Sequence, residues 1–206
     1  MRLFTALHLS DALREHLVRA RTRFVVSART ETIDPHAALR PVAGEKLHLT
    51  LVFLGEVSTE HVSKIEDAFD HACTDKTVGP VPLVTTSIGA FPSPNRPRVI
   101  WAGVEDRERR IAAVEERLRS SFNKIGSLRL DSRPFHPHIT LAYLRSNSDR
   151  HARRAVAHAL QRFVPMEPLR DTAAPNGSYA TRIALVESKP GPEGTRYVDR
   201  LAYDIA

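Results

Sequence analysis

The chain has 206 residues, a formal net charge of +6 and a single cysteine. One cysteine excludes an intramolecular disulfide and any metal site built from several thiolates. No run of about 18 apolar residues is present, so the sequence predicts no membrane-spanning helix, and we expect a cytoplasmic protein. The excess of positive charge is compatible with a phosphate-rich partner and equally with a role in solubility alone.

The first half of the chain alternates strands and helices. Residues 3–9 have the composition of a strand, and Ser10 is a suitable N-cap for a helix with apolar residues at helical spacing. Residues 29–45 carry two prolines and no sustained period, which indicates a long loop. A strand over 46–54 follows, and a turn at Gly55 leads into a second helix.

The second half continues with the same kinds of element. Two strands are expected over 81–90 and 98–104, joined by a proline-rich turn, and a helix is expected over 107–123. Another strand, its helix and a proline-rich connector come next. A hairpin closes the chain, with strands near 179–188 and 195–204. The order predicts an α+β protein in which antiparallel sheets line a central groove and helices lie outside.

One strand occurs twice, ninety residues apart. The stretch His-Leu-Thr-Leu-Val-Phe-Leu at 48–54 is matched by His-Ile-Thr-Leu-Ala-Tyr-Leu at 138–144. Because side chains alternate along a strand, His48 and Thr50 share one face. The other face is expected to carry Leu49, Leu51 and Phe53. If the two copies pair about a pseudo-two-fold axis, two imidazoles, which exchange protons near neutral pH, and two hydroxyls, which donate to anions, face one cleft.

The histidines and aromatic residues near the motifs allow other interpretations. His136 and His138 share a strand face and could chelate zinc or copper, but the sequence offers no third and fourth ligand in a recognisable pattern, so no metal site is predicted. Phe91, Trp101 and Tyr143 could stack on a nucleobase. For Phe91 and Trp101, packing in the core is the simpler interpretation.

The repeat and its flanking residues resemble those of a known family. They are Gly55 after the first motif, Gly-Ala-Phe-Pro at 89–92, Pro-Arg-Val-Ile-Trp-Ala-Gly-Val at 97–104, and Arg-Pro-Phe-His-Pro at 133–137 before the second motif. Together they resemble the two-histidine phosphoesterases, in particular the RNA 2′,3′-cyclic phosphodiesterases, historically called 2′-5′ RNA ligases. The resemblance covers nearly the whole chain.

The resemblance implies one domain over residues 1–206 with two pseudo-symmetric lobes, carrying the motifs at 48–51 and 138–141. It implies a groove without metal or cofactor that hydrolyses 2′,3′-cyclic phosphate ends of RNA to 2′-phosphate ends. The partners would be RNA ends or small cyclic nucleotides, and we expect a monomer. Reversible 2′-5′ RNA ligation and RNA binding without turnover are the alternatives.

The resemblance also implies a role for each motif residue. His48 would be the proton donor and His138 the proton acceptor, while Thr50 and Thr140 would hold the phosphate oxygens. Tyr143 departs from the pattern, because many family members carry arginine at this position. The core chemistry does not require an arginine contact to phosphate, and Arg98, Arg133 or Arg145 could supply positive charge from nearby. The candidate substrate contacts are Phe91, Arg98, Arg133, His136, Tyr143 and Arg145.

Overall fold

A computed structural model describes residues 1–29, 38–74, 80–126, 128–162, 179–192 and 194–205. Residues 30–37 of the expected loop at 29–45 and the proline-rich connector at 164–177 lie outside these residues. No helix in the described ranges is both long enough and apolar enough to cross a membrane.

The described residues form the expected succession of strands and helices, with additions. The strands are β1 (Arg2–Leu9), β2 (Leu39–Pro41), β3 (His48–Glu56), β4 (Val84–Phe91), β5 (Val99–Glu105), β6 (His138–Leu144), β7 (Ala180–Lys189) and β8 (Arg196–Asp204). The helices are α1 (Asp11–Ser27), α3 (Val62–Thr74), α4 (Arg110–Asn123) and α5 (Arg150–Arg162), with short 3₁₀ helices at Gly44–Lys46 and Thr59–His61. The predicted α+β class is confirmed.

The strands join into one antiparallel sheet that divides into two lobes. Its order is β4-β5-β6-β3-β1-β7-β8, and β2 adds to β6. The motif strands β3 and β6 meet in the middle, where Leu49 pairs with Ile139. One lobe therefore contains β1, β3, β7 and β8, and the other contains β2, β4, β5 and β6. The two copies of the motif face each other across this junction.

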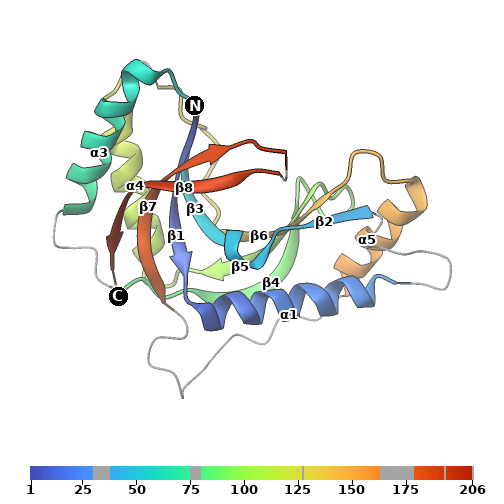
Figure 1. The fold of residues 1–206 in the computed structure, drawn as a ribbon. Coiled ribbons are helices and arrows are strands. Elements are labelled where there is room, and N and C mark those ends of the chain that lie inside the picture. Colours follow the sequence, from blue (N-terminus) through green and yellow to red (C-terminus); the bar gives the residue numbers. More distant parts are fainter. Residues whose placement is uncertain (30–37, 75–79, 127, 163–178, 193, 206) are drawn as a thin grey trace.

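The helices cover the lobes in a crossed arrangement (Figure 1). Helix α1 follows β1 of the first lobe but packs against β6 and α5 of the second. Helix α4 follows β5 of the second lobe but packs against α3 and β3 of the first. Each lobe is thus covered by a helix that follows a strand of the other lobe, and this exchange connects the two lobes around the junction.

Two elements differ from the sequence prediction. Helix α4 begins at Arg110 and not at residue 107, because the carboxylate of Asp106 accepts hydrogen bonds from the backbone N–H groups of Ile111 (3.0 Å) and Ala112 (2.7 Å), while Arg109 is left-handed with φ 54°. The end of the expected loop at 29–45 forms strand β2, which pairs with β6. This strand was not predicted, and it extends the wall of the groove.

Candidate active site

A groove runs across the junction of the motif strands and has two arms. The arm beside His138, here called the His138 arm, has a volume of about 690 Å³. The arm beside His48, here called the His48 arm, has a volume of about 480 Å³. Both arms are lined by Thr50, Phe53, Thr140 and Tyr143. Thr50 and Phe53 of the first motif copy correspond to Thr140 and Tyr143 of the second. The centre of the groove is therefore lined by equivalent residues from both copies.

The pairing of β3 with β6 sets the positions of the four motif side chains. With Leu49 opposite Ile139 in an antiparallel pair, His48 comes across from Thr140 and Thr50 from His138. On one face of such a pair, diagonal neighbours lie about 7–8 Å apart, with their Cβ atoms somewhat closer. The two histidines are such neighbours, a separation that leaves room for one tetrahedral anion between the rings.

Bulges change the facing of the residues that follow each threonine. The register of β3 against β1 shifts between Phe4 and Ala6, and the register of β6 against β5 shifts between Ile100 and Trp101. As a result, the two residues after each motif threonine are buried, and the next one returns to the groove face. Phe53, expected on the buried face, is instead half exposed and lines the groove. Strict alternation failed here because the bulge adds a residue to the strand.

His48 is held by contacts to both ring nitrogens and to both sides of the ring. Its Nδ1 lies 2.8 Å from the carbonyl oxygen of Lys46, and its Nε2 lies 3.0 Å from Oγ1 of Thr50. Because a carbonyl can only accept, Nδ1 carries a hydrogen and Nε2 is the nitrogen free to exchange a proton. Phe4 stacks on the ring at 5.0 Å between centroids, and the edge of Tyr197 contacts it at 5.3 Å.

His138 has an equivalent environment. Its Nδ1 lies 2.6 Å from the carbonyl oxygen of His136, so its Nε2 is likewise the exchanging nitrogen. The rings of Phe91 and Trp101 contact it edge-on, with centroids 5.0 Å and 6.2 Å away. Trp101 itself lies over Gly89, where any Cβ would come within 2.3 Å of the indole. Both motif histidines are therefore fixed in one tautomer by a backbone carbonyl and in one orientation by two aromatic rings.

Burial disfavours the charged form of both imidazoles. It lowers the pKa of His48 to about 4, with smaller contributions from His8 and His138, against the opposing hydrogen bond to Lys46. It also lowers the pKa of His138, as does the neighbouring His136. Both rings are therefore predominantly neutral at neutral pH in the free protein.

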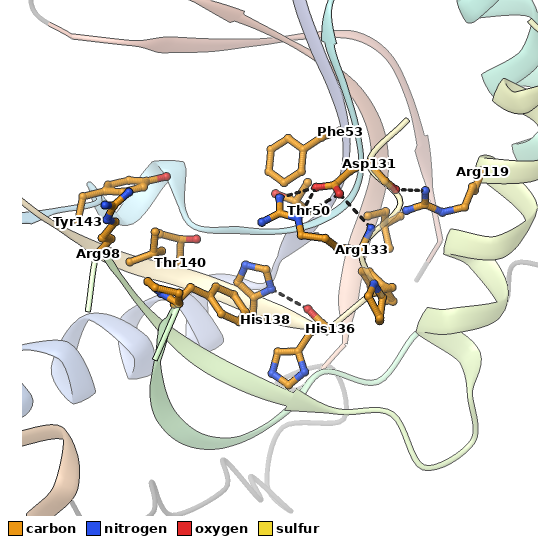
Figure 2. A pocket seen from close by; sticks show the side chains of 16 residues that line it. Thr50, Phe53, Arg98, Arg119, Asp131, Arg133, His136, His138, Thr140 and Tyr143 are labelled. Atoms are coloured by element: carbon orange, nitrogen blue, oxygen red, sulfur yellow. Dashed lines mark hydrogen bonds and ion pairs between the residues drawn. The ribbon is translucent and has the colours of Figure 1, made fainter. Parts of the chain in front are cut away.

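The structure brings most of the other predicted contact residues to the groove. Phe91, Arg98, Arg133, His136 and Tyr143 line the His138 arm, and Figure 2 shows Arg98 and Tyr143 toward one end of it and the Arg133–Asp131 ion pair toward the other. Arg145 is exposed and does not line either arm. Trp101 also lines neither arm, and it supports His136 and His138 from behind.

Sequence reasoning missed the basic residues of the His48 arm. Arg2, Arg40 and Lys46 line it, together with Phe4 and Tyr197. The guanidinium of Arg40 lies 5.2 Å from the centre of the Tyr143 ring. Arg40 comes from β2, which was not predicted, and only the sheet brings it to Tyr143. A positive charge is thus present beside the position where the resemblance led us to expect arginine.

The described residues contain no group of three or more His, Cys, Asp or Glu side chains arranged to hold a metal ion.

Comparison with known proteins identifies the family. The 2′-5′ RNA ligase superfamily matches residues 8–191. The chain belongs to this superfamily. An RNA 2′,3′-cyclic phosphodiesterase of Escherichia coli is 36% identical over 140 residues, covering 68% of this chain and 70% of the relative. One of Archaeoglobus fulgidus is 28% identical over 167 residues, covering 81% and 86%.

Solved structures of the superfamily share the fold. The protein TT0787 of Thermus thermophilus superposes with a TM-score of 0.73 at 25% identity, covering 100% of this chain and 98% of that one. E. coli LigT in complex with 3′-AMP gives 0.66 at 29% identity, covering 99% and 96%. The bilobal, duplicated architecture expected from the sequence is therefore confirmed.

Proposed function

We propose that this protein hydrolyses 2′,3′-cyclic phosphate ends of RNA to 2′-phosphate ends without a metal ion, and that residues 1–206 act as one domain. The observation that carries the proposal is the paired geometry of His48 and His138, each with Nδ1 on a backbone carbonyl and each lining an arm of the groove that also contains Thr50 and Thr140. Membership of the superfamily and the names of its relatives support the same reaction.

The proposed reaction is an in-line displacement at phosphorus. Neutral His138 takes a proton from water as the water oxygen bonds to phosphorus. The bond from phosphorus to O3′ breaks, and protonated His48 gives its proton to that oxygen on the opposite side. The product keeps the phosphate on O2′. The hydroxyls of Thr50 and Thr140 donate to the phosphate oxygens on which negative charge builds up.

The test uses an adenosine 2′,3′-cyclic phosphate and an oligonucleotide with the same end, both with EDTA present. We expect a 2′-phosphate product, and the variants His48→Ala and His138→Ala should each reduce turnover by about 10²- to 10⁴-fold. Circular dichroism and thermal unfolding check that the variants fold. Loss of wild-type activity with EDTA, or a 3′-phosphate product, would contradict the proposal.

The same experiment separates the alternatives. Supplying a second RNA with a 5′-hydroxyl tests ligation, in which that hydroxyl replaces water at the same phosphorus. Retention of the oligonucleotide without any product would instead indicate a binding module that lacks turnover.

A further inference from the structure

The two arms of the groove differ in their charge. Arg98, Arg119 and Arg133 line the His138 arm, but Arg133 is paired with Asp131 and Arg119 with Glu115. The His48 arm is lined by Arg2, Arg40 and Lys46, and none of the described residues that line it is Asp or Glu. Within the described parts of the chain, none of these three cations forms an ion pair. The excess positive charge of the groove is therefore concentrated on the side of His48.

Arg40 is placed at the centre of this charge by the sheet. Strand β2 sets it directly opposite Tyr143 of β6, and the guanidinium lies over the tyrosine ring. The N–H edge of a guanidinium matches two oxygens of a phosphate. Tyr143 lines both arms, so Arg40 is held beside the central groove and faces into the His48 arm.

The electrostatics of Tyr197 show that Arg2 shares this space. Burial and Tyr143 raise the pKa of the Tyr197 phenol, while Arg2 and Arg40 both lower it. Two guanidinium groups, Arg2 from β1 and Arg40 from β2, therefore act on one hydroxyl. Lys46 lines the same arm, two residues before His48. All three cations therefore line the arm that also contains Tyr197, whose ring packs against His48.

The proposed reaction gives this cluster a ligand. If His48 protonates the departing O3′, the ribose of the terminal nucleotide lies on its side of the phosphorus, and the preceding nucleotide, joined through O5′, can extend into the same arm. We propose that Arg2, Arg40 and Lys46 bind the phosphodiester on the 5′ side of the terminal nucleotide. This inference rests on the proposed function, and it assigns oligonucleotide ends, not free cyclic mononucleotides, as the preferred substrate class.

The test compares adenosine 2′,3′-cyclic phosphate, which lacks the second phosphate, with the dinucleotide ApA ending in the same cyclic phosphate. We expect wild-type kcat/KM to be about 10- to 100-fold higher for the dinucleotide, the range that one charge-assisted hydrogen bond supplies. In Arg40→Gln this ratio should fall toward one. Tyr143→Leu, which keeps Arg40 but removes its platform, should lower the ratio in part, whereas Tyr143→Phe should retain it.

Arg98→Gln is the matched control, because Arg98 lines the other arm and its loss should leave the ratio as in wild type. Equal wild-type kcat/KM values for the two substrates would overturn the second phosphate site. An unchanged ratio of kcat/KM in Arg40→Gln would overturn it as well. Either result would leave the proposed function standing. If neither substrate is cleaved, the proposed function fails. The second phosphate site is then tested by the equilibrium binding of adenosine 2′-phosphate and of ApA ending in a 2′-phosphate. Equal affinities of the protein for these two products would overturn the second phosphate site.

Discussion

Protonation of His48 offers the sharpest test of the site. Burial lowers the pKa of this imidazole to about 4. At pH 7 only about one ring in a thousand would then be charged in the free protein, yet a group that donates to a leaving oxygen must carry its proton beforehand. The substrate phosphate must therefore raise the pKa of His48 when it binds in the groove.

The size of this effect follows from Coulomb's law. A unit negative charge about 4 Å from the ring, at an effective dielectric constant near 20, stabilises the imidazolium by about 4 kcal/mol. Since one pKa unit corresponds to about 1.4 kcal/mol, the pKa of His48 should rise by roughly 3 units, from about 4 to near 7. The substrate phosphate would thus convert a neutral ring into an acid suited to neutral pH.

The measurement is a histidine titration by NMR between pH 3.5 and 8.5. Spectra with saturating sodium sulfate, whose charge is constant over this range, are compared with spectra in sodium chloride at equal ionic strength. The variant His48→Gln assigns the signal. We expect a pKa near 4 in chloride and an increase of at least two units in sulfate.

Two results would refute this reasoning. A pKa near 6.5 in chloride would mean that burial by Phe4 and Tyr197 does not control the ring. A larger increase in the pKa of His138 than in that of His48 would reverse the proposed donor and acceptor. The proton donor is the imidazole whose charged form the anion stabilises more.

Three further predictions follow from the same geometry. Thr50→Val should lower kcat by about 10²- to 10³-fold, because it removes a donor to phosphate and the partner of His48 Nε2, while Thr50→Ser should recover most of the rate. Gly89→Ala should lower the free energy of unfolding by about 1–3 kcal/mol in urea titrations and also slow turnover, because the new methyl group displaces Trp101 from behind His138. The free energy of unfolding should decrease as pH falls from 6.5 toward 4, because the unfolded chain binds a proton at His48 that the folded chain does not. In urea melts over this pH range, His48→Gln should show a smaller dependence of the free energy of unfolding on pH. A slope unchanged in that variant would assign the loss to other groups.

The sequence predicted what depends on local pattern. The repeated His-x-Thr unit indicated both motif strands, and helical spacing indicated the four described α-helices, because periodicity is a property of neighbouring residues. The position of Phe53 was wrong because a bulge depends on the partner strand and leaves no mark in the alternation of one strand. Arg40 could not be placed at all, since its relation to Tyr143 exists only after β2 has joined β6.

The crossed placement of α1 and α4 bears on how such a molecule folds. A fragment ending after α3 would retain one motif but lose α4, β7 and β8, which complete its lobe, and it would carry α1 without β6 and α5, against which α1 packs. The remaining fragment would lack α1, which covers its lobe, and would carry α4, β7 and β8 without β1 and β3. Neither piece could bury its own apolar surface, so we expect the two to be stable only when associated. Acquiring the hydrophobic interior and bringing both imidazoles to one anion are then a single cooperative event.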